Sequence, residues 1–188
     1  SIISQANHLK KNIKFEKNYL KRIEILTALL LTGLVFKEYE ENYEVAIREL
    51  EKFVKVFFDQ DGFPLSRNPS DLIFFSKHLI LCRESIKDAQ KHIPEFLNEI
   101  INQNLICIKK ITTPNDQIPF FNGGVEEDLQ QFDKYIGNLK NISKDKKNIV
   151  GGIQVFKFKT NYVFFYFGVL PRKIFYIFFL SYLFFLFF

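Results

Sequence analysis

The order of hydrophobic and polar positions along the chain predicts helices over most of its length. Between residues 17 and 38 apolar residues occupy nearly every side of a helical wheel, which is typical of a central helix packed on several neighbours. Lys21, Arg22 and Glu24 interrupt this run, so it does not match a membrane span. Residues 42–58 carry one apolar stripe at three- and four-residue spacing and charged residues on the other face, as expected for an amphipathic helix.

Two more helices follow, each with a start signal. Asn68-Pro69-Ser70-Asp71 has the order of an N-cap, a proline at the first helical position and an acid in the first turn, so a helix is predicted over 69–87. Ile93-Pro94-Glu95 opens another, predicted over 93–111. Because the connections are short relative to the helices, we expect all four to pack as antiparallel neighbours. A short helix is also predicted at 125–138.

The hydrophobic period changes from Gly151 onward. Val155–Lys159 alternates between apolar and polar residues as a half-buried strand does, Asn161 can turn the chain, and Tyr162–Val169 can return as a second strand. Helices followed by a hairpin indicate a mainly α chain whose β-hairpin opens a second domain. The predicted division is a helical domain at 1–139, a linker at 140–149, the start of a β domain at 150–171, and a Phe-rich tail at 172–188.

Composition and charge exclude several classes of function. The net charge is +5, but the lysines are scattered rather than gathered on one basic face with interleaved aromatics, so no nucleic-acid partner is expected. The sequence shows no leader of the secretory type. Cys82 and Cys107 lie in apolar helical runs without zinc-type spacing, which predicts buried free thiols.

The remaining candidates for metal chemistry have simpler interpretations. His78 and His92 are predicted to be surface or capping residues, since no second histidine stands at ligand spacing. The acids at 126–128 follow a turn and would favour the dipole of a helix that starts there. We therefore expect neither a metal nor a cofactor.

Two long polar loops, 59–68 and 119–124, stand between the predicted helices. Long ordered loops on a helical scaffold often carry function. The alternative is that Asn68-Pro69 only starts a helix and that Asn122-Gly123 only makes a turn. In an antiparallel array both loops belong to the same end, so we expect Arg67 and Asn122 to flank one cleft.

The run from Glu24 to Phe36, followed by Asp61-Gly62, Ser66-Arg67-Asn68-Pro69 and Phe121-Asn122-Gly123, resembles the helical region of heparinase II/III-like proteins. The resemblance covers residues 5–170. It implies an incomplete α/α toroid followed by an antiparallel β-sandwich. It also implies a polysaccharide lyase that acts by β-elimination on uronic-acid glycans, an acidic polysaccharide or oligosaccharide as partner, and a place in the cell envelope or periplasm. Heparan, alginate and bacterial envelope glycans all fit as substrate.

β-Elimination needs a group that neutralises the uronate carboxylate and another that transfers protons. The resemblance implies Asn18 and Asn122 as catalytic residues and Asp61, Arg67 and Asn68 as substrate-binding residues. The family's Asn-His-Leu has two counterparts here, Asn18-Tyr19-Leu20 and Asn7-His8-Leu9, and the choice between them stays open.

The chain also departs from the family pattern. Asp71 stands where the family has its catalytic tyrosine, and Phe63-Pro64 stands where Gly-His is common. A further catalytic histidine would come from the β domain. We therefore expect this fragment to lack lyase activity.

The carboxyl end has an unusual composition. Residues 174–188 are almost entirely Phe, Leu, Ile and Tyr, and as a helix they are short for a bilayer core of about 30 Å. Three interpretations stay open: a frameshifted tail, a short membrane anchor, or a buried strand. They leave two alternatives to a truncated lyase, namely a non-catalytic helical protein with membrane contact through this tail, or a carbohydrate-binding scaffold.

Overall fold

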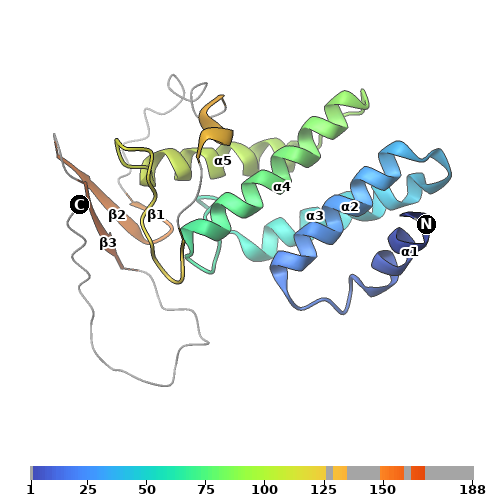
Figure 1. The fold of residues 1–188 in the computed structure, drawn as a ribbon, viewed down its shortest axis with the longest axis horizontal. Helices are drawn as coiled ribbons and strands as arrows, with labels where there is room; N and C mark the ends of the chain where they lie inside the picture. Colours follow the sequence, from blue (N-terminus) through green and yellow to red (C-terminus); the bar gives the residue numbers. More distant parts are fainter. Residues whose placement is uncertain (1, 126–128, 135–148, 159–161, 168–188) are drawn as a thin grey trace. The chain divides into compact units, whose positions relative to one another are not determined.

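The computed structural model describes residues 2–125, 129–134, 149–158 and 162–167, which are mostly helical with a small antiparallel sheet (Figure 1). They form two compact units. The first holds residues up to 57 together with 74–102, and the second holds 58–73 together with the described residues from 103 onward. The Phe-rich tail predicted at 172–188 lies outside the described residues. Within those residues, no helix combines the length and the apolar character that crossing a membrane requires.

The four predicted helices are confirmed with small shifts at their ends. They are α2 at Tyr19–Val35, α3 at Glu40–Phe57, α4 at Pro69–Asp88 and α5 at Glu95–Ile111. A short 3₁₀ turn, Lys37–Tyr39, joins α2 to α3. The helix α1, Ile2–Asn12, was not predicted; Ala6, one of its few apolar residues, is buried.

In the first unit, α2 and α3 form an antiparallel helical hairpin (Figure 1). At one end of the hairpin a Cβ added to Gly33 would lie 2.3 Å from the backbone nitrogen of Tyr43, so only glycine permits this approach. At the other end the rings of Tyr19 and Phe57 are 5.6 Å apart. Phe75 of α4 completes this cluster, with its ring centroid 5.5 Å from that of Phe53. Ile23, Leu26, Leu29 and Leu30 of α2 are buried, in agreement with a central helix, whereas Val35 at its end is exposed.

The second unit contains a three-stranded antiparallel sheet in the order β1-β2-β3. The strands are β1 at Ile149–Val150, β2 at Ile153–Lys157 and β3 at Tyr162–Tyr166. The predicted hairpin is therefore present, with its first strand beginning two residues earlier than the alternation suggested. Ile149, placed by sequence in the linker, belongs to an additional short strand. Gly151 packs on Phe63, since a Cβ at Gly151 would lie 2.4 Å from the Phe63 ring.

Of the helix predicted at 125–138, the described residues show a 3₁₀ turn, Gln130–Phe132, followed by residues 133 and 134 in helical conformation. The rest of that span is only partly described, and residues 126–128 and 135–148, which include most of the predicted linker, lie outside the described residues.

Candidate functional site

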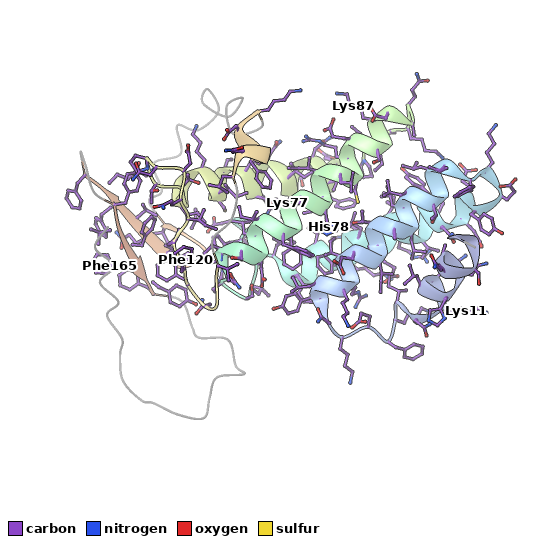
Figure 2. The ribbon with its side chains drawn as sticks, in the orientation of Figure 1. Lys11, Lys77, His78, Lys87, Phe120 and Phe165 are labelled. Carbon is purple, nitrogen blue, oxygen red and sulfur yellow. The ribbon has the colours of Figure 1, made fainter. Side chains whose placement is uncertain are left out.

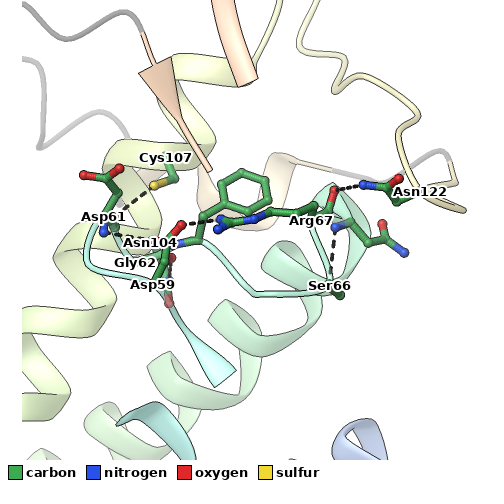
Figure 3. A network of polar contacts seen from close by, with 10 residues as sticks. Asp59, Asp61, Gly62, Ser66, Arg67, Asn104, Cys107 and Asn122 are labelled. Carbon is green, nitrogen blue, oxygen red and sulfur yellow. Dashed lines mark hydrogen bonds and ion pairs between the residues drawn. The ribbon is translucent and has the colours of Figure 1, made fainter. Parts of the chain in front are cut away.

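The loop at 59–68 is folded around the carboxylate of Asp59 (Figure 3). Its Oδ1 accepts hydrogen bonds from the backbone N–H groups of Asp61, at 3.0 Å, and Phe63, at 2.8 Å. The backbone of Asp59 and Phe63 pairs as well, with Asp59 N donating to Phe63 O at 2.9 Å. An aspartate that bonds the N–H two residues ahead is a common turn former. Here it gives a rigid loop with the Phe63 side chain fully buried beneath it.

The same loop is tied to α5 through backbone carbonyls. Asn104, which is fully buried, donates its Nδ2 hydrogen to the carbonyl of Gly62 at 2.5 Å, and the Cys107 thiol donates to the carbonyl of Asp61 at 3.1 Å. Gly62 has a left-handed backbone (φ 81°), and a Cβ there would lie 2.4 Å from Cβ of Gln103. Both facts require glycine, so Gly62 in the Asp-Gly motif has a clear structural role.

Arg67 is held at the other end of this loop. Its Nη1 forms an ion pair with Oδ2 of Asp59, and the two side chains are only 20% and 18% exposed. Its backbone is left-handed (φ 57°), which is uncommon for a residue other than glycine. The guanidinium predicted to bind a substrate carboxylate therefore already contacts a carboxylate of its own loop.

Asn122 joins the second loop to the first. Its Nδ2 donates to the backbone carbonyl of Arg67 at 2.9 Å, and its own backbone is left-handed as well (φ 50°). The adjacent Phe121 packs against β3, with ring centroids 6.3 Å from Phe164 and 6.0 Å from Tyr166. The two loops are therefore in direct contact, as the prediction that they lie together requires. A cleft between them was also predicted, but their contact is a hydrogen bond between neighbouring segments.

Asn68 acts as the N-cap of α4, as its position before Pro69 predicted. Its Oδ1 accepts from the N–H of Ser70 at 2.8 Å. The Ser70 hydroxyl in turn accepts from the N–H of Val125 at 2.8 Å, just after the second loop. A Cβ on Gly124 would lie 3.3 Å from Asn68 Oδ1. The amide of Asn68 thus supports the junction of the two loops and the helix start.

Asn18 belongs to the first unit and caps α2. Its Oδ1 accepts from the N–H groups of Leu20, at 2.9 Å, and Lys21, at 3.2 Å. The competing Asn7-His8-Leu9 lies on α1, where the His8 ring contacts Asn12 at 3.1 Å. The other four predicted site residues belong to the second unit. The role that the structure gives Asn18 is that of a helix cap.

Asp61 and Asp71 differ in their surroundings. Asp61 is exposed, and in the described structure it uses its backbone rather than its carboxylate to bind Cys107 and Asp59. Asp71, at the position of the expected catalytic tyrosine, is 7% exposed in the first turn of α4. A carboxylate cannot replace a phenol in acid–base chemistry without a strong change of pKa.

Both thiols are free and buried, as predicted. Burial raises the pKa of Cys107 to about 12, with Asp59 and Asp61 adding to the effect, and burial raises the pKa of Cys82 to about 11. Both therefore stay protonated near neutral pH and are not nucleophiles. Among the described residues, no group of His, Cys, Asp and Glu has the arrangement of a metal site.

The prediction that His78 is a surface or capping residue is wrong. His78 lies within α4, half-buried, with Nδ1 3.2 Å from the Thr27 hydroxyl and its ring 4.8 Å from that of Phe74 (Figure 2). The Thr27 hydroxyl donates its hydrogen to the carbonyl of Ile23 at 2.9 Å, so the His78 contact requires a hydrogen on Nδ1. Burial lowers the pKa of His78. The sequence contained no polar partner at helical spacing to reveal this contact.

Two residues in the hydrogen-bond network of the 59–68 loop, Asp59 and Asn104, were not identified as candidates from the sequence. Asp59 had a usable signal, because an aspartate two residues before Asp-Gly can form a turn on its own side chain. Asn104 had none, since its partner, Gly62, is distant in the chain.

The arrangement places the cation Arg67 between the carboxylate of Asp59 and the junction of the two loops, where Arg67 and Asn122 have left-handed backbones. It offers hydrogen-bond donors for an acidic group. Around the junction, no tyrosine or histidine is found among the described contacts of Arg67 and Asn122. Comparisons of the chain with protein-family models, with curated proteins and with solved structures find no significant match.

Proposed function

We propose that this chain is part of a heparinase II/III-like protein and that its two joined loops contact an acidic glycan without cleaving it. In this proposal the helices belong to an incomplete α/α toroid, and the hairpin β2-β3 opens a β-sandwich domain. The helical character and the antiparallel sheet agree with that architecture.

The observation that carries the proposal is the junction between Arg67 and Asn122. Both residues hold left-handed backbone conformations and are bonded to each other. Such conformations cost of order 1–3 kcal/mol each for residues other than glycine and cluster at ligand-binding sites. Gln90 and Asp116 have the same left-handed backbone in other turns. What distinguishes Arg67 is that its segment also accepts the bond from Asn122 and its side chain pairs with Asp59.

Arg67 is suited to a uronate carboxylate despite its ion pair with Asp59. A guanidinium carries five N–H donors in a planar fork, and the ion pair engages Nη1. A glycan carboxylate can bind the remaining donors or displace Asp59. The partly buried setting strengthens either contact, because screening by water is reduced.

Binding rather than cleavage is proposed because the proton-transfer position is occupied by Asp71. Abstraction of the proton beside a uronate carboxylate needs a base whose pKa is close to the working pH. A buried carboxyl in the first turn of a helix is better explained by the favourable interaction of an acid with the helix dipole.

The test is the affinity of the full chain for a uronate tetrasaccharide, measured by calorimetry for the wild type, Asn122→Gly and Asn115→Gly. Glycine keeps the left-handed backbone at 122 but removes the amide that holds Arg67. Asn115 is an exposed asparagine of the preceding loop segment and serves as the matched control. We expect about a fivefold loss for Asn122→Gly, in line with the loss of one hydrogen bond of about 1 kcal/mol, and no change for Asn115→Gly.

Equal affinities of the two variants would contradict a binding role for the loop junction. Absence of saturable binding by the wild type would contradict it as well.

A further inference from the structure

A groove in the first unit is lined by the end of α1, the turn that follows it, and one stripe of α3. It has a volume of about 540 Å³, which is within the range of small-ligand sites. From α1 and its turn come Asn7, Lys10, Lys11, Ile13 and Lys14, and from α3 come Glu41, Val45, Arg48 and Glu49.

The two carboxylates of the groove are already matched by cations. Glu41 pairs with Lys10 at 2.5 Å. Glu49 pairs with Lys52 at 2.8 Å and with Arg22 at 3.5 Å, and these cations lower its pKa, the hydrogen bond from Lys52 most of all. Neither carboxylate is therefore free to attract a cation from solution.

Two lysines that line the groove form no ion pair with a carboxylate among the described residues. Lys11 and Lys14 are exposed, and the ion pairs formed by the described residues include neither of them. Arg48 lies 3.8 Å from Glu49, a carboxylate that is shared with closer cations. The groove thus presents an excess of positive charge within a concave surface. Figure 2 shows Lys11 on α1.

We propose that this groove binds the carboxylate or sulfate group of an acidic oligosaccharide through Lys11, Lys14 and Arg48. The identity of the ligand as a glycan rests on the proposed function, whereas the preference for an anion rests on the unpaired cations that line the groove. Asn7 supplies an amide beside the cations, which suits the hydroxyl groups of a sugar. The site is separate from the Arg67–Asn122 loops in sequence and lies in the other unit.

The experiment measures binding of fluorescent tetrasaccharides to the full chain. A heparin tetrasaccharide carries sulfates and carboxylates, an oligogalacturonate carries carboxylates only, and maltotetraose is neutral. The test variant is Lys11→Ala/Lys14→Ala, and both it and its control also carry Arg67→Ala, so that the proposed loop site does not contribute to the binding measured. The control variant, Lys17→Ala/Lys21→Ala, removes two exposed lysines of the same unit that do not line the groove.

We expect the test variant to weaken binding of a charged tetrasaccharide about fivefold to tenfold, as the loss of two exposed charge contacts of up to about 1 kcal/mol each implies. The control variant changes affinity less than about twofold on the same scale. The two charged probes show whether sulfate or carboxylate is preferred, and maltotetraose does not bind.

Equal losses in the test and control variants would overturn the groove as a site, as would unchanged binding in the test variant. Tighter binding of a single-stranded oligonucleotide of equal charge would overturn the glycan assignment. Failure here is distinct from failure of the loop site, because Asn122→Gly leaves the groove intact and Lys11→Ala/Lys14→Ala leaves the loops intact.

Discussion

Asn122 donates a hydrogen bond of 2.9 Å to the backbone carbonyl of Arg67, a residue 55 positions earlier in the chain, and both residues have left-handed backbones. This hydrogen bond joins the 59–68 loop to the 119–124 loop. It also fixes the segment whose side chain forms the ion pair with Asp59. The proposed binding of an acidic glycan depends on this contact between Asn122 and Arg67.

A comparison of Gly62 with Gly123 distinguishes the cost of backbone strain from the cost of a steric clash. Both have a positive φ, at 81° and 88°, but a Cβ at Gly62 meets Gln103 at 2.4 Å whereas a Cβ at Gly123 has nothing within 4 Å. We expect Gly123→Ala to cost about 1 kcal/mol of unfolding free energy from strain alone. Gly62→Ala should cost at least about 2–3 kcal/mol, since overpacking adds to the strain.

Chemical denaturation of both variants followed by circular dichroism checks this order. Equal losses of stability would show that the approach of Gly62 to α5 is not a constraint.

The lowered pKa of His78 leads us to expect that the free energy of unfolding depends on pH. Burial lowers its pKa below 6.5, partly opposed by Glu24, so the unfolded chain binds a proton more readily than the folded chain. The stabilising contribution of the neutral ring is therefore complete above about pH 6.5, the ordinary value for histidine, and is lost as pH falls below it.

The measurement is the thermal midpoint of the wild type, His78→Gln and His92→Gln between pH 5 and pH 8. His78→Gln should flatten the acid side of the profile, while His92→Gln, an exposed control, should leave it as in the wild type. Identical profiles for all three proteins would exclude His78 as the cause.

The chain is expected to show no lyase activity. Asp71 occupies the position of the expected tyrosine, and the neighbourhood of Arg67 contains the carboxylate of Asp59 rather than a free base. Incubation with heparin, alginate and polygalacturonate should give no rise in the ultraviolet absorbance of the unsaturated product. Steady turnover that vanishes in Arg67→Ala would show that the chain is an enzyme.

The helices α2 to α5 could be predicted because their signals are local, whereas α1 was missed. The apolar stripe of α3 and the Asn68-Pro69 start of α4 depend on residues a few positions apart. The contact of Asn104 with Gly62 in the candidate site could not be predicted, because the two residues meet only after folding, and the same holds for Thr27 and His78 in the first unit. The roles of Asn18 and Asn68 as caps were visible in their positions before helices, and there the local interpretation agrees with the structure.

The direct test of the binding proposal is the affinity of Asp59→Asn for a uronate tetrasaccharide, compared with Asp61→Asn. Asparagine keeps the Oδ1 acceptor that organises the turn at 59 and removes the charge that occupies Arg67. Asp61→Asn removes the same charge from an exposed position of the same loop. If Arg67 binds the glycan carboxylate, Asp59→Asn should bind the tetrasaccharide more tightly than both the wild type and Asp61→Asn. The expected gain over the wild type is about threefold or more, because the variant releases Arg67 from a partly exposed ion pair of roughly 1 kcal/mol. Equal affinities for the two variants, with both still folded by circular dichroism, would contradict the binding of an acidic glycan by Arg67.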